Sequence, residues 1–178
     1  MTILHFLALV AVLVVAVTMD LRERRIPNWV TVPGVTAGIV IGAFMQGGIP
    51  FSALTGAALA LLVSFPLVAL GGLGAGDAKL LTAVGAFTGP AGLLPVMVYG
   101  AIAGGVLAVG KMIRRRALLG VLVNMKNLLV YWITLGRAGQ RISLDSLGAQ
   151  SVPYGVAIAA GALMAWFYPF SLSLGASP

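Results

Sequence analysis

Long apolar runs, separated by short polar or glycine-rich segments, dominate the pattern of this chain. Five runs approach the length of about 20 residues that a helix needs to cross a bilayer, and they cover residues 3–19, 29–45, 51–70, 91–112 and 152–168. A sixth run, over residues 80–88, is shorter and predicts a short fourth span. Backbone groups in lipid must be hydrogen-bonded within the chain, so these runs predict helices. We expect an all-α, polytopic membrane bundle of about six transmembrane helices, forming a single integral-membrane domain over residues 1–178.

Residues 117–135 have a different pattern from the six runs. Asn124, Asn127, Tyr131 and Thr134 recur at helical spacing within an otherwise apolar segment, with Lys126 beside them. Such a polar stripe predicts an amphipathic helix that lies along the cytoplasmic interface or lines a wet cavity. We prefer this interpretation to a seventh span.

Composition supports a membrane location. Hydrophobic residues make up 60% of the chain and charged residues only 8%, which is too little polar material to cover a soluble core. If six spans alternate in direction, the face that carries the loops after spans one, three and five holds all the basic residues: Arg22, Arg24, Arg25, Lys79, Lys111, Arg114, Arg115, Arg116, Lys126, Arg137 and Arg141. The positive-inside rule then places this face in the cytoplasm, with both termini outside. We interpret the net charge of +7 as basic residues that face anionic membrane lipids, and we expect no nucleic-acid partner.

The inventory of reactive side chains is short. The chain has no cysteine and one histidine, His5, which stands in an apolar run. Thiolate chemistry and cysteine zinc sites are thereby excluded, and a histidine triad is not expected. We predict no metal and no cofactor.

Two aspartates are the candidates for chemistry. Asp20 stands at the end of the first predicted helix, where a charged loop over residues 20–28 begins, and Asp77 stands at the start of the fourth. The predicted topology puts both at the same membrane face. Two carboxylates held close together share a proton, because both cannot easily be ionised. The ionised one can take a proton from an attacking water while the protonated one hydrogen-bonds a peptide carbonyl. The alternative is that both are interfacial charges paired with arginines.

The segments around these aspartates are specific. The first contains Asp20, Arg22, Ile26, Pro27 and Asn28, and the second contains Gly74, Gly76, Asp77 and Lys79. In order and spacing they resemble the Asp-x-Arg-x-x-x-Ile-Pro-Asn and Gly-x-Gly-Asp-x-Lys patterns of the type IV prepilin peptidase family, within the Gly-x-Gly-Asp membrane aspartyl proteases. Pro153, Tyr154 and Gly155 look like the family's Pro-Tyr/Phe-Gly stretch, which opens the last span.

The resemblance implies a function. Asp20 and Asp77 would be the catalytic pair, Arg22 and Lys79 would position or tune the site, and the remaining matched residues would shape the cleft. The substrate would be the basic leader of a prepilin or pseudopilin in the inner membrane, cut at the cytoplasmic face. Larger members carry a cysteine-rich zinc insertion and methylate the new N-terminus. This chain lacks the cysteines and resembles the compact tight-adherence (Flp-type) branch, so we expect an aspartic endopeptidase without methyltransferase activity.

Other functions fit parts of the pattern. A related preflagellin peptidase would use the same chemistry on a different partner. A small proton-coupled transporter would favour acids at mid-membrane and an internal repeat. A non-catalytic subunit of a secretion machine would tolerate neutral residues at Asp20 and Asp77.

Overall fold

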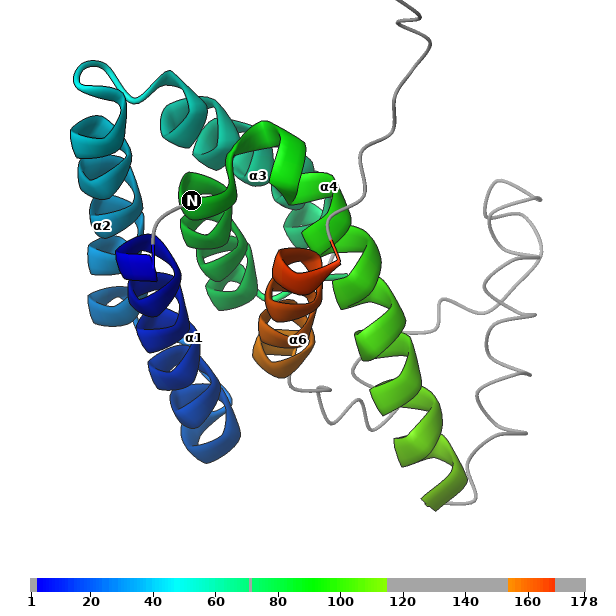
Figure 1. Cartoon of the computed structure of the whole chain (residues 1–178). Coiled ribbons are helices and arrows are strands. Elements are labelled where there is room, and N and C mark those ends of the chain that lie inside the picture. Colours follow the sequence, from blue (N-terminus) through cyan, green and yellow to red (C-terminus); the bar gives the residue numbers. More distant parts are fainter. Residues whose placement is uncertain (1–2, 71, 115–153, 169–178) are drawn as a thin grey trace, which may run out of the picture. The chain divides into compact units, whose positions relative to one another are not determined.

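The computed structural model describes residues 3–70, 72–114 and 154–168, and every regular element in those residues is a helix (Figure 1). In chain order the helices are α1 (Ile3–Glu23), α2 (Asn28–Gln46), α3 (Phe51–Ala69), α4 (Ala75–Arg114) and α6 (Tyr154–Phe167). The all-α prediction is confirmed. The amphipathic helix predicted over residues 117–135 falls outside the described residues.

The distribution of side chains is that of an integral membrane protein. Within the described residues, four helices, α1 to α4, are long and apolar enough to cross a bilayer. Large apolar side chains point outward, as with Phe44 and Leu62, which are 84% and 70% exposed. Small residues fill much of the interior, including Ala16, Ala60 and Ala83, each fully buried. Such small-residue interfaces are typical of membrane bundles, where helices associate by close packing rather than by the hydrophobic effect.

The chain divides into two compact units, residues 1–104 with 153–178, and residues 105–152. Within the described residues, the second unit contributes only the C-terminal end of α4, from Gly105 to Arg114. The acidic site described below lies entirely in the first unit.

The first half of α4 is the central helix of the first unit. It packs against α2, where added Cβ atoms at Gly34 and Gly38 would lie 3.3 and 2.9 Å from the Cβ atoms of Ala83 and Ala86. It packs equally closely against α3, because a Cβ at Gly56 would overlap the carbonyl oxygen of Gly85. Helix α1 in turn packs on α2 and α6, and α2 packs on α3. Figure 1 shows this first, darker green part of α4 enclosed by other helices.

Helix α4 breaks at Gly89, as the Gly89-Pro90 pair predicts. Gly89 has φ 68° and ψ 179°, which is outside the helical region and open mainly to glycine. Figure 1 shows the chain turning there, so that the second half runs back and reaches α6. At that contact an added Cβ on Gly161 would lie 2.5 Å from the backbone of Gly100 and Val96.

Two helices extend beyond their apolar runs. Helix α1 continues to Glu23, one turn beyond the predicted end at Met19, so Asp20 lies within a helix and not in the loop. Helix α4 begins at Ala75, five residues before the apolar run that starts at Leu80, so Asp77 lies at the start of the helix as predicted. In both cases polar residues continue a helix past its apolar run, because they lie at the end where the helix leaves the membrane interior.

Candidate active site

Asp20 is a buried acid on the last turns of α1. Its side chain is only 7% exposed, although it is flanked by the exposed residues Leu21 and Arg22. The Asp20 carboxylate oxygen Oδ2 accepts a hydrogen bond of 2.9 Å from the backbone N–H of Gly155. A buried carboxylate needs such a partner, since an unpaired one carries a large desolvation cost.

Gly155 is the second residue of α6, and its amide is free to bind a side chain because the first N–H groups of a helix have no partner within it. A Cβ atom at this position would lie 2.7 Å from Oδ2 of Asp20. Glycine is therefore what lets the start of α6 approach the carboxylate.

Asp77 lies in the first turn of α4 and is half-buried. The backbone of Gly74, the residue before the helix, hydrogen-bonds its carboxylate, in the manner of an acid at the third helical position that reaches back to the N-cap amide. An added Cβ on Gly74 would come within 2.7 Å of Asp77 Oδ2. Capping alone accounts for an acid at this position, so the case for chemistry depends on what Asp77 faces.

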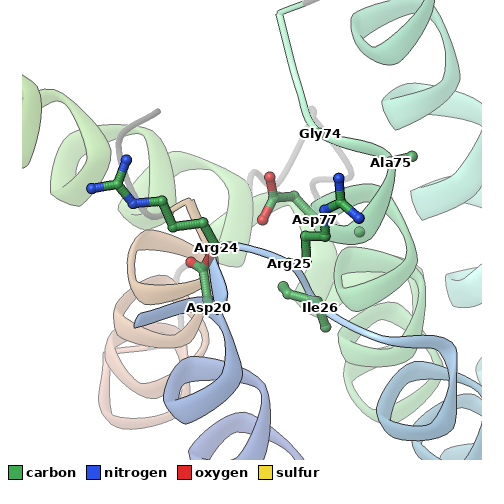
Figure 2. Close-up of a pocket in the computed structure, with 8 residues that line it drawn as sticks. Asp20, Arg24, Arg25, Ile26, Gly74, Ala75 and Asp77 are labelled. Atoms are coloured by element: carbon green, nitrogen blue, oxygen red, sulfur yellow. The ribbon is translucent and has the colours of Figure 1, made fainter. Parts of the chain in front are cut away.

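Asp77 faces Asp20 across a pocket of about 330 Å³. Figure 2 shows the Asp77 carboxylate extending from the start of α4 toward the end of α1, where Asp20 lies beside Arg24. The two acids are close enough to interact electrostatically. The structure therefore brings together the two aspartates that the sequence paired, although 57 positions separate 20 from 77.

Glycine also sets the width of this pocket. At Gly76 an added Cβ would lie 3.3 Å from the Cβ, backbone nitrogen and backbone oxygen of Ile26. The start of α4 thus rests directly on the main chain of the α1–α2 loop. Both Ile26 and Gly76 line the pocket, together with Gly74 and Ala75.

Sequence reasoning missed two cations that line the pocket, Arg24 and Arg25, which it treated only as signals of topology. Arg24 has φ 52°, in the left-handed region, and its amide donates to the backbone oxygen of Asp20 at 3.0 Å. This is the usual way to end a helix, but glycine normally fills the position. Within the part of the chain that the structure describes, neither arginine forms an ion pair. The sequence signal that could have identified both arginines is that they follow Asp20 closely, at positions 24 and 25.

Several predicted site residues lie elsewhere. Lys79 and Asn28 do not line the acidic pocket; Lys79 Nζ donates to Asn28 Oδ1 at 2.8 Å, and both border a second pocket. Arg22 is exposed on α1, Tyr154 begins α6 with 39% exposure, and neither lines the acidic pocket. Pro27 precedes α2 with φ −73° and ψ 154° and sets the direction of that helix. Pro153 lies outside the described residues.

The acidic pocket contains two carboxylates and two guanidinium groups, and no thiol or imidazole. Over residues 3–70, 72–114 and 154–168, no group of three or more His, Cys, Asp or Glu side chains is placed to hold a metal ion. The chemistry within reach of these side chains is acid–base chemistry by a carboxyl pair.

Comparison with known proteins gives one family. Residues 7–109, more than half of the 178-residue chain, match the family model of the type IV leader peptidase family. The matched region contains Asp20 and Asp77 and ends before Gly155. Searches of curated proteins and of solved structures give no match.

Proposed function

The chain belongs to the type IV leader peptidase family and is a membrane peptidase, and from this premise we propose that it is an aspartic endopeptidase whose catalytic pair is Asp20 and Asp77. One observation carries the proposal: the two carboxylates, one on α1 and one on α4, line the same pocket. Glycines at 74 and 76 leave that part of the pocket wall without side chains, which favours the close approach of a peptide backbone to the carboxylates.

The proposed reaction is hydrolysis of a peptide bond with one proton shared by the pair. The ionised carboxylate takes a proton from water as the water oxygen bonds to the scissile carbonyl carbon. The protonated carboxyl donates to the carbonyl oxygen and stabilises the tetrahedral intermediate. When the C–N bond breaks, the leaving amine takes a proton from the pair, and the products are a carboxylic acid and a free amine.

The proposed substrate is a prepilin or pseudopilin, cleaved between its basic leader and its apolar helix. Such a substrate sits in the inner membrane with its leader in the cytoplasm, on the face to which the basic residues assign Asp20 and Asp77. We further propose that the enzyme cleaves without methylating the new N-terminus, since the chain contains no cysteine for a zinc insertion.

The test is co-expression with a prepilin substrate and measurement of leader removal by the mass of the product. Asp20→Asn and Asp77→Asn each remove one member of the acid–base pair, and we expect each to lower the cleavage rate at least 100-fold. Glu23→Gln is the matched control, an exposed acid on the same helix that does not line the pocket, and it should cleave like the parent.

Normal processing by both asparagine variants would refute the enzyme mechanism and favour a non-catalytic role in a secretion machine. Loss of cleavage in only one of the two asparagine variants would refute the proposal that the aspartates act as a pair.

A further inference from the structure

A second pocket, of about 290 Å³, lies on α2, α3 and α4. We call it the lateral groove, and the part of its lining that matters here comprises Asn28, Val32, Val35, Leu61, Lys79 and Thr82. None of these six residues lines the acidic pocket. The groove therefore includes two residues of the paired sequence motifs, Asn28 and Lys79, that the proposed cleavage does not use.

The head of the groove is cationic. The only hydrogen bond of the Lys79 ammonium within the described residues goes to the neutral amide of Asn28, and Lys79 forms no ion pair with them. An ammonium group has three donors, so two remain for an occupant. Asp77, two residues away, lines the acidic pocket and not the groove, so none of the groove's lining residues within the described part of the chain is an acid.

Below its head, the groove is lined by the apolar residues Val32, Val35 and Leu61 together with three threonines, at positions 31, 36 and 82. Val32 on α2 and Leu61 on α3 are 59% and 52% exposed, on helices long enough to cross the bilayer. Asn28 is the first residue of α2 and Lys79 lies on the second turn of α4. The groove therefore begins at the end of the bundle where the charged residues lie and continues along lipid-facing helices.

We propose that the lateral groove binds one anionic phospholipid, with its phosphate on Lys79 and Asn28 and an acyl chain along Val32, Val35 and Leu61. Charge complementarity selects this occupant. A phospholipid combines a phosphate anion with an apolar chain in the order that the groove presents them, and anionic lipids are enriched in the cytoplasmic leaflet. The basic leader of the proposed substrate would be repelled by Lys79.

Binding can be measured without any assay of cleavage. The purified full-length protein is reconstituted in phosphatidylcholine nanodiscs that contain a trace of phosphatidylglycerol with a photoactivatable diazirine on its acyl chain. After illumination, the labelled peptides are identified by mass spectrometry. We expect labels to concentrate on α2 around Val32 and Val35 and on α3 around Leu61, above the level on other exposed apolar residues.

Two pairs of variants test the assignment. Lys79→Gln should lower labelling of the groove about tenfold, which corresponds to the loss of one charge-assisted contact of about 1.4 kcal/mol. Arg114→Gln, which removes a charge from the end of α4, should leave it unchanged. Leu61→Trp should block the groove and lower labelling, whereas Leu62→Trp, at an exposed neighbour that does not line the groove, should not.

Several outcomes would overturn the proposal. They are uniform labelling of the lipid-facing surface, labelling that Lys79→Gln does not change, and equal labelling by a photoactivatable phosphatidylcholine. Suppression of the label by millimolar inorganic phosphate would show that the cationic head of the groove binds a free anion and not a lipid. Displacement of the label by a substrate peptide that itself crosslinks to Leu61 would assign the groove to substrate.

The consequence for cleavage rests on the proposed function. Because Lys79 and Asp77 lie within one turn of α4, an anionic lipid on Lys79 steadies the helix start that carries the acid. Replacing phosphatidylcholine with phosphatidylglycerol should then raise the cleavage rate of the parent several-fold, and of Lys79→Gln much less. An inactive parent that still labels at the groove would refute the proposed function alone.

Discussion

The backbone amide of Gly155 hydrogen-bonds the Asp20 carboxylate, although 135 positions separate the two residues in the chain. Asp20 has its own motif neighbours, but its hydrogen-bond partner is the amide at the start of α6. Because Oδ2 of Asp20 accepts this bond, the orientation of the carboxylate in the pocket depends on Gly155. Gly155 is in this sense a positioning residue for Asp20.

Gly155→Ala should separate activity from stability. The added Cβ would lie 2.7 Å from Oδ2 of Asp20 and must displace the carboxylate. Since misplacing a catalytic group by about 1 Å can cost roughly 100-fold in rate, we expect a loss of that order in leader cleavage. The free energy of unfolding, measured by thermal unfolding in detergent, should fall by about 1–3 kcal/mol, because the displaced carboxylate loses its buried hydrogen bond, and the higher helix propensity of alanine offsets part of this. Such a loss leaves the protein folded and does not account for the loss of cleavage. Gly105→Ala, where the added Cβ meets nothing within 4 Å, is the control and should retain activity.

Arg24 occupies a backbone conformation that suits glycine better. With φ 52°, a non-glycine residue pays about 1 kcal/mol or more in steric strain. Arg24→Gly should therefore keep or raise the free energy of unfolding, by up to about 1 kcal/mol. Arg22→Gly, within the last turn of α1, should instead lower it by about 1 kcal/mol, because glycine is unfavourable inside a helix. Equal destabilisation by both variants, measured by thermal unfolding, would contradict this account.

At the level of elements, the break in α4 depends on α1 as well as on Gly89 and Pro90. The turn at Gly89 interrupts the helical hydrogen bonds just past the carbonyl of Phe87. Nε2 of His5 donates to that oxygen at 2.7 Å, and the His5 ring meets the Phe87 ring edge-on at 5.2 Å. The single histidine is buried, at 5% exposure, and acts as a cap for the broken helix.

His5→Phe should destabilise the bundle without touching the site. The change keeps a ring of similar size but leaves the Phe87 carbonyl without its donor, which costs about 1–3 kcal/mol for a buried group. The melting temperature in detergent should fall accordingly. Thr18→Ala removes only an exposed, local bond to the Val14 carbonyl and should have almost no effect. A His5→Phe protein as stable as the parent would show that another group satisfies this carbonyl.

Across the first unit, the described charges gather at one end. Asp20, Arg22, Glu23, Arg24, Arg25, Asp77 and Lys79 belong to the end of α1, the loop after it and the start of α4. At the other end, His5 of α1 meets the α4 break, and residues 46–50 between α2 and α3 carry no charge. This one-sided arrangement is the physical basis for our proposal that the acidic pocket faces the cytoplasm.

The absence of cysteine makes that orientation directly testable. Glu23→Cys and Gly48→Cys each place one thiol at an exposed position, at the charged end and the uncharged end respectively. A membrane-impermeant maleimide added to intact cells, or to spheroplasts where an outer membrane intervenes, should label Gly48→Cys and not Glu23→Cys. Inverted membrane vesicles should give the reverse. Labelling of Glu23→Cys from outside would place the pocket on the wrong face for a cytoplasmic leader.

Much of the fold and the identity of the acids followed from the chain itself. Apolar run lengths predict helices because lipid offers no partner for the backbone, and Gly89-Pro90 predicts the break because few residues adopt that conformation and proline has no N–H. Asp20 and Asp77 stood out because acids are rare in this chain and the flanking residues are specific. The end of α1 and the start of α4 extend beyond their apolar runs, since hydropathy marks the lipid boundary and not the end of a helix.

Contacts between distant segments were decided only by the tertiary structure. No local pattern could predict that the Gly155 amide binds Asp20, that Arg24 and Arg25 line the pocket, or that Lys79 turns to Asn28 and a separate groove. Local sequence determines where a helix forms and which of its residues are polar. The direction in which each polar side chain points depends on how closely neighbouring helices approach, and here glycines on separate helices set that approach.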